Sequence, residues 1–105
     1  ALKSHRYVEG TDILNEDAFE ILVKSFLDAN LQGLTECELL SVSVKGKDWK
    51  NVSEKLKTVI RRTDYLGFRK NGELQILLPN TDKDGAESVR KRLINAGIFA
   101  GEQVV

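Results

Sequence analysis

The dipeptide Asn71-Gly72 constrains the fold of this 105-residue chain more than any other feature. It separates two short runs rich in apolar residues, 65–68 and 74–78. Asn-Gly readily takes the positive φ angles of a tight, two-residue type I′ turn. We therefore expect these two runs to form the strands of an antiparallel hairpin.

Three other segments show the apolar spacing of three and four residues that is typical of amphipathic helices. They begin at the capping residues Asn15, Asp48 and Thr81, and they end near residues 30–33, residues 61–64 and Gly97. Thr81 is followed three residues later by Asp84, a pattern that resembles a capping box. The positions predicted to face the core are Phe19, Leu22, Val23, Phe26 and Leu27 in the first helix, Trp49, Val52, Leu56, Val59 and Ile60 in the second, and Ala86, Val89 and Leu93 in the third.

Residues 38–44 and 98–105 are the remaining strand candidates. After the first helix, the order is then strand, helix, strand, strand, helix, strand. This order predicts an α+β, ferredoxin-like fold: a four-stranded antiparallel sheet with helices packed on one face, plus an N-terminal helix. Residues 1–12 lack periodicity and are interpreted as a tether, which leaves 13–105 as the domain.

The composition is that of one small globular domain, with 41% hydrophobic and 30% charged residues. Sixteen basic residues balance sixteen acidic ones, so no overall field favours binding of DNA or RNA. The single Cys37 cannot form an internal disulfide, and no run of about 20 apolar residues predicts a membrane span. We expect a cytoplasmic domain without membrane insertion and, because the chain opens on Ala1, with neighbouring domains in a longer protein.

Several spaced motifs follow one another in the second half of the chain. Arg-x-x-Asp at 61–64 precedes the hairpin, the second hairpin strand ends in Leu78-Pro79, and Thr81-Asp82 opens a helix that carries Arg92. In order and spacing, residues 52 to 95 resemble the second half of a GGDEF domain, the fold of the bacterial diguanylate cyclases. The resemblance implies a nucleotidyl-cyclase-like version of the predicted sheet.

The signature hairpin of that family is heavily altered here. It reads Lys70-Asn71-Gly72-Glu73-Leu74 in place of Gly-Gly-Asp/Glu-Glu-Phe, so that only the acid Glu73 remains. The first strand supplies no carboxylate at 40–44 for the metal ions of an active cyclase, and residues 45–48 are too few for the insertion that recognises guanine. We therefore expect a degenerate domain that is not an enzyme and that holds no metal or cofactor.

A second site of the family is retained. Active members bind their product, cyclic di-GMP, at an inhibitory site built from Arg-x-x-Asp and a helix arginine, and the resemblance places these residues at Arg61, Asp64 and Arg92. A guanidinium group matches the O6/N7 edge of guanine or a phosphate, and a carboxylate accepts from guanine N–H groups. The resemblance thus implies a signalling domain that binds cyclic di-GMP and relays its occupancy to neighbouring domains.

Other interpretations remain open. Arg61 and Arg62 also suit the C-terminal end of a helix dipole, with Asp64 as an ion-pair partner. The chain is then a structural or dimerisation module of a bacterial regulator, with no nucleotide bound. Residual activity on GTP rests only on Glu73, and an RNA-recognition module would need exposed aromatic residues that strand 74–78 lacks.

Overall fold

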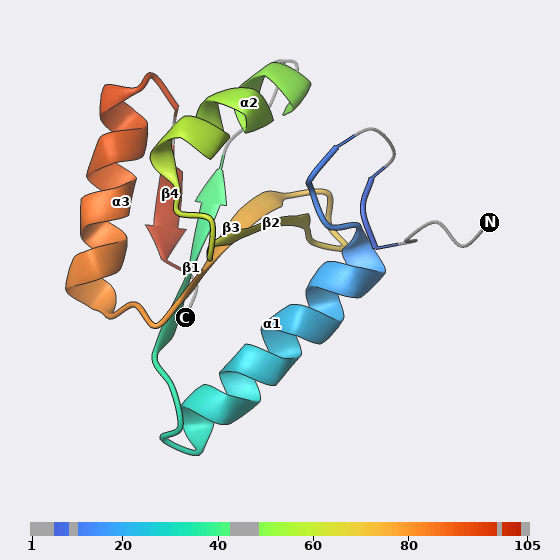
Figure 1. The fold of residues 1–105 in the computed structure, drawn as a ribbon, viewed down its shortest axis with the longest axis vertical. Helices are drawn as coiled ribbons and strands as arrows, with labels where there is room; N and C mark the ends of the chain where they lie inside the picture. Colours follow the sequence, from blue (N-terminus) through green and yellow to red (C-terminus); the bar gives the residue numbers. More distant parts are fainter. Residues whose placement is uncertain (1–5, 9–10, 43–48, 99, 104–105) are drawn as a thin grey trace.

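The computed structural model describes residues 6–8, 11–42, 49–98 and 100–103 (Figure 1). In chain order, its elements are α1 (Glu16–Leu31), β1 (Cys37–Val42), α2 (Trp49–Val59), β2 (Tyr65–Phe68), β3 (Leu74–Pro79), α3 (Lys83–Asn95) and β4 (Ala100–Gln103). The predicted α+β class is confirmed: the described residues form three helices and an antiparallel sheet.

The strands form an antiparallel sheet in the order β2-β3-β1-β4. β1 and β3 pair over six residues, from Cys37 opposite Pro79 to Val42 opposite Leu74, and β2 pairs along the other edge of β3. β4 meets β1 through two residue pairs, with an irregular register between them. The pairings of β3 with β1 and with β2 are therefore the regular part of the sheet.

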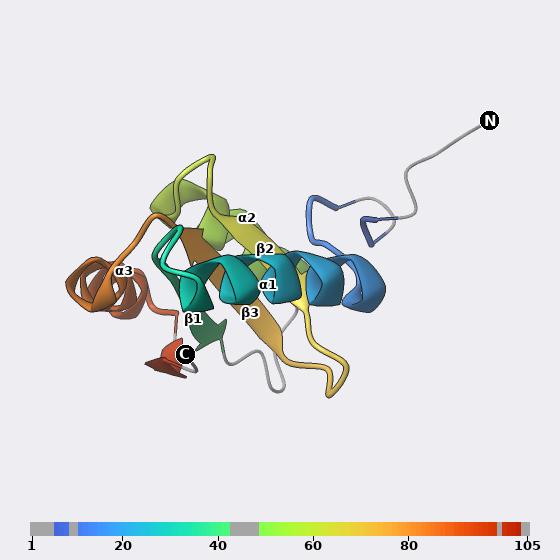
Figure 2. The ribbon, with the colours of Figure 1, turned by 90° about the horizontal axis from the view of Figure 1, so that it is seen from below.

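The helices cover both faces of this sheet. Figure 1 shows α1 on one side of the strands and α2 and α3 on the other, and Figure 2 shows α1 lying across the sheet. Alternate side chains of β3 follow this division: Leu77 packs in the cluster of α1, whereas Ile76 and Leu78 pack in the cluster of α2 and α3. The expectation of helices on one face holds for α2 and α3, and the N-terminal helix closes the opposite face.

Two of the predicted helix boundaries are confirmed. Asn15 is the N-cap of α1, where its Oδ1 accepts a hydrogen bond from the amide of Ala18 at 2.9 Å. Gly97 follows the C-cap Ala96 of α3 with a φ of 82°, as a glycine in the C′ position does. The predicted cap Asp48 lies outside the described residues.

The predicted cap Thr81 is wrong by one position. Asp82 is the N-cap of α3, because its Oδ1 accepts a hydrogen bond from the amide of Gly85 at 2.8 Å. The Thr81 hydroxyl instead donates to the carbonyl oxygen of Pro79 at 2.9 Å. Thr81 is thereby buried in the loop between β3 and α3.

The hairpin is present, but its predicted turn type is wrong. A type I′ turn needs positive φ at both central residues, and here only Gly72 has it, at 87°. The amide of Gly72 donates to the carbonyl of Arg69, and the amide of Arg69 donates to that of Glu73, so the loop holds three residues, 70–72. Asn71 supports this longer loop, because its Oδ1 accepts from the amide of Glu73 at 2.9 Å.

The described part of the predicted tether is hydrogen bonded to the domain. The amide of Asn15 donates to the carbonyl of Arg6 at 2.7 Å, and the amide of Val8 donates to that of Ile13 at 2.8 Å. Ile13 is fully buried. This segment therefore returns along the start of α1, which brings Asp12 close to α2.

Candidate functional site

Arg61 and Asp64 form one compact unit at the turn between α2 and β2. The backbone amide of Arg61 donates to Asp64 Oδ2 at 2.8 Å, and Arg61 Nη2 donates to Asp64 Oδ1 at 2.8 Å. The amide of Asp64 in turn donates to the carbonyl of Arg61 at 3.1 Å. The sequence spacing of three residues therefore produces a closed turn whose carboxylate and guanidinium are paired.

The same guanidinium group also reaches the loop between β3 and α3. Nη2 of Arg61 donates to Thr81 Oγ1 at 2.7 Å and to the carbonyl of Pro79 at 3.1 Å. These contacts join segments about twenty residues apart in the sequence. Arg61 is therefore held in one orientation by three acceptors, and two of them, Thr81 and Pro79, were not among the predicted site residues.

The two partners differ in exposure. The side chain of Asp64 is 0% exposed, whereas that of Arg61 is 47% exposed. Nη1 of Arg61 has no hydrogen-bond partner among the described residues. The arrangement thus presents one free guanidinium edge at the surface, and a ligand can contact the oxygens of Asp64 only if Arg61 moves away.

A surface hollow of about 320 Å³ lies beside this pair. Its lining includes three cationic side chains, Lys57, Arg61 and Arg62, together with Asp12. Lys57 is paired with Asp12 at 2.6 Å and Arg61 with Asp64 at 2.8 Å, which leaves Arg62 as the cation of this lining without an ion pair among the described residues. Such a hollow suits a phosphate or the acceptor edge of a purine better than it suits a cation.

Arg92 is placed apart from this hollow. It lies in the last turn of α3 and is exposed, whereas Arg61 contacts Thr81 just before the first turn of that helix. The nine positions from Lys83 to Arg92 correspond to about 14 Å of helix. The structure therefore brings together Arg61 and Asp64, and Arg92 is no part of the hollow beside them, although α2 packs against α3 on the same face of the sheet.

Arg90 is engaged within α3. Its Nε donates to Glu87 Oε2 at 2.9 Å, and this pairing lowers the pKa of Glu87 and raises that of Arg90. The positive charge of Arg90 is therefore balanced by Glu87 of the same helix.

The retained hairpin acid, Glu73, is engaged by its neighbours across the sheet. Its Oε2 accepts from the hydroxyl of Ser41 at 3.2 Å and from Nε2 of Gln75 at 3.3 Å. Arg69 extends the network by donating to Gln75 Oε1 at 3.1 Å. Among the described residues, no three His, Cys, Asp or Glu side chains gather where they could hold a metal ion.

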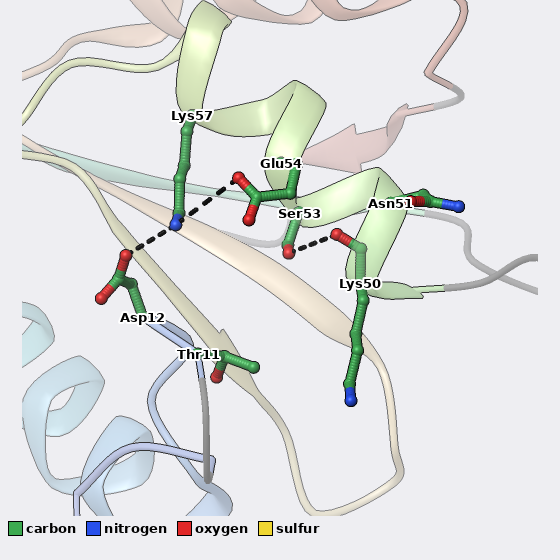
Figure 3. A pocket seen from close by; sticks show the side chains of 7 residues that line it. All are labelled: Thr11, Asp12, Lys50, Asn51, Ser53, Glu54 and Lys57. Atoms are coloured by element: carbon green, nitrogen blue, oxygen red, sulfur yellow. Dashed lines mark hydrogen bonds and ion pairs between the residues drawn. The ribbon is translucent and has the colours of Figure 1, made fainter.

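A second, larger hollow of about 540 Å³ lies between the N-terminal segment and α2 (Figure 3). Lys57 points from α2 toward Asp12 at 2.6 Å and Glu54 at 3.7 Å. The hydrogen bond to Asp12 is the main reason why the pKa of Lys57 is raised. No sequence pattern indicated this pairing, because Asp12 belongs to the segment interpreted as a tether.

The chain matches no protein-family model, and a search of the curated proteins finds no match. Within the part of the chain that the structure describes, no helix combines the length and apolar character needed to span a bilayer.

Proposed function

We propose that this chain is a non-catalytic, GGDEF-like signalling domain of a cytoplasmic bacterial regulator, and that it binds cyclic di-GMP at the hollow beside Arg61, with Arg92, which lies outside this hollow, as a second contact at the other end of the ligand. Asp64 acts in this proposal as a positioning residue, because both of its oxygens are used to hold Arg61. The sheet order β2-β3-β1-β4 is compatible with the ferredoxin-like, nucleotidyl-cyclase-like arrangement that the sequence resemblance implies.

The observation that carries the proposal is the orientation of Arg61. A guanidinium fixed by a buried carboxylate, a hydroxyl and a carbonyl loses little side-chain entropy when a ligand binds. Arg61, whose Nη1 has no hydrogen-bond partner among the described residues, and the neighbouring Arg62 line a hollow that is open to solvent. Guanine O6/N7 and phosphate oxygens are both acceptors that such an edge recognises.

The absence of catalysis in the proposal rests on the hairpin. Glu73 is occupied by Ser41 and Gln75, and the loop carries Lys70 and Asn71 where the family's paired glycines let the triphosphate approach. Ser41 stands on β1, the strand that would have to supply a second metal-binding carboxylate. GTP with Mg²⁺ or Mn²⁺ should therefore give no cyclic product.

Titration calorimetry with cyclic di-GMP tests the proposal directly. We expect saturable heat with the unaltered chain, and a loss of affinity of about tenfold or more in Arg92→Ala, since a lost charge-assisted hydrogen bond costs about 1.5–3 kcal/mol. Lys91→Ala, which removes a neighbouring exposed cation, is the matched control and should bind normally. An absence of heat, or equal affinities for all three proteins, would refute nucleotide binding at these residues.

Arg61→Ala provides a second arm, but it also removes contacts that stabilise the fold. Its affinity is therefore compared with that of Thr81→Val, which removes one acceptor of the Arg61 guanidinium and leaves the charge in place. We expect Arg61→Ala to abolish binding and Thr81→Val to weaken it moderately. Retained affinity in a folded Arg61→Ala protein would contradict the proposed role of this residue.

A second candidate function is an interaction module that associates with another copy of itself. The observation that favours it is the exposure of large apolar side chains on and just after α1, where Ile21, Leu31 and Leu34 face solvent. Exposed leucine and isoleucine side chains gathered on one element mark association surfaces more often than isolated ones do.

A further inference from the structure

The solvent side of α1 carries a stripe of four exposed residues, Ile21, Lys24, Asp28 and Leu31. They are spaced three, four and three residues apart, so they lie along one face of the helix, as the seam positions of a coiled coil do. Ile21 is 69% and Leu31 85% exposed, whereas Phe19 and Val23 on the opposite side of the helix are buried against the sheet. Two large apolar residues thus flank two opposite charges in a stripe that nothing in the described chain covers.

The two charges of the stripe are not paired within the chain. Neither Lys24 nor Asp28 forms an ion pair with another described residue, although they stand four positions apart on one helix. A lysine on the N-terminal side of an acidic residue is the weaker of the two possible orders for such a pair. Both groups are therefore available to a partner.

We propose that this stripe is the contact through which two copies of the chain associate, with their α1 helices packed antiparallel about a two-fold axis at position 26. Ile21 then lies opposite Leu31 of the partner subunit, and Lys24 lies opposite the partner's Asp28. The symmetry produces each contact twice, since the same surface meets itself in an isologous dimer. This inference rests on the second candidate function, the self-associating interaction module, and it specifies the surface through which the two copies associate.

The order of residues in the stripe selects this arrangement over others. In a parallel pair, Lys24 would face a second lysine and Asp28 a second aspartate, and both contacts would repel. In the antiparallel pair, each apolar residue meets an apolar one and each charge meets its opposite. The spacing of three and four residues is that of helices that pack at a shallow crossing angle.

One helix pair is a small interface, so the association should be weak. Contacts well below about 1,200 Å² of total buried area are typical of transient complexes. We therefore expect a dissociation constant in the range of about 10 µM to 1 mM, which corresponds to about 4–7 kcal/mol. A neighbouring domain in a longer protein would strengthen it by raising the effective concentration.

Sedimentation equilibrium of the whole chain tests the inference, with loading concentrations up to about 1 mM so that the weakest association in the expected range is seen. The apparent mass should rise from the monomer value of 11.8 kDa toward twice that value. Ile21→Asp should hold the protein at the monomer mass. Lys55→Asp, which reverses an exposed charge on α2 on the other face of the sheet, is the matched control and should associate normally.

Exchanging the charges at positions 24 and 28 distinguishes the antiparallel register from non-specific association. Lys24→Asp and Asp28→Lys should each weaken association at least threefold, since each places like charges opposite one another, and the double variant should restore it. Far-UV circular dichroism checks that α1 persists in each variant. A monomer at every concentration, normal association of Ile21→Asp, or a double variant no better than the single ones would each overturn the inference.

The proposed association through α1 should not depend on nucleotide binding. α1 lies on the face of the sheet opposite α2 and the Arg61 turn, so Ile21→Asp should leave the calorimetric titration with cyclic di-GMP unchanged (Figure 1). Conversely, Arg92→Ala should leave the sedimentation behaviour unchanged. Failure of one proposal is thus seen separately from failure of the other.

Discussion

Gly67 of β2 lies directly against the ring of Phe19 of α1. A Cβ atom at position 67 would stand 2.1 Å from Phe19 Cδ1 and 2.6 Å from Phe19 Cβ, far inside van der Waals contact. Phe19 is fully buried between the helix and the sheet. The missing side chain at 67 is therefore what lets α1 approach the sheet closely enough to close this face.

Gly67→Ala should destabilise the domain by about 1–3 kcal/mol or more, because the added methyl group must push Phe19 out of its rotamer or lift the helix. Urea denaturation gives the free energy of unfolding. The same substitution in a Phe19→Ala background should cost much less, since the clash is then gone, and the cycle measures the coupling. Equal costs in the two backgrounds would show that Phe19 does not impose the glycine.

The Arg61 turn offers a second test of stability. Asp64→Ala leaves the backbone amide of Arg61 and its guanidinium without their buried acceptor, and it should lower the free energy of unfolding by about 1–3 kcal/mol. Arg62→Ala, one position along the chain and exposed, should change it by less than about 0.5 kcal/mol. Similar small effects for both would mean that the buried carboxylate contributes little to the fold.

The periodic parts of the sequence predicted the fold well, for physical reasons that the structure makes plain. The apolar spacing of 19, 22, 23, 26 and 27 places one face of α1 on the sheet, and the residues expected to face inward in α3 are buried. The sequence pattern predicted the wrong N-cap where two neighbouring residues could each cap the helix. The side chains of Thr81 and Asp82 can both cap a helix, but the Thr81 hydroxyl instead donates to the carbonyl of Pro79 and accepts from Arg61.

The candidate site was predicted only in part, because its geometry depends on tertiary contacts. The spacing of Arg61 and Asp64 predicted that they would meet, but it contained no sign that Asp64 would be fully buried. The acceptors are Pro79 at the end of β3 and Thr81 in the loop that follows, and both lie beside the turn only in the folded chain. The position of Arg92 relative to this turn likewise depends on how α3 lies on the sheet, which no local pattern specifies.

Substitution of Gly72 tests whether the hairpin requires a glycine only because of the positive φ angle at this position. Its φ is 87°, and an added Cβ would meet no atom within 4 Å, so the cost of Gly72→Ala arises from conformation and not from crowding. We expect a loss of about 1–2 kcal/mol in the free energy of unfolding. Gly72→Asn should lose less, because asparagine adopts positive φ more readily. A neutral Gly72→Ala would indicate that the turn rearranges at little cost.

Glu38 should make the stability of the domain depend on pH in the direction opposite to that of an ordinary paired carboxylate. The side chain is buried on β1, and its Oε1 has no hydrogen-bond partner in the described part of the chain. Burial raises the pKa of Glu38 above its usual 4.5, and the charges of Asp82 and Glu36 add to this shift while Lys83 opposes it. The folded state therefore holds the proton more tightly than the unfolded state does. The contribution of this group to stability is fully present below about pH 4.5 and is lost as the pH rises through the raised value.

Because glutamine has the same shape and never ionises, Glu38→Gln should unfold at a higher urea concentration than the unaltered chain at about pH 7 and at nearly the same concentration at about pH 4. A difference that stays constant between these two pH values would mean that Glu38 titrates normally and that its burial carries no cost of ionisation.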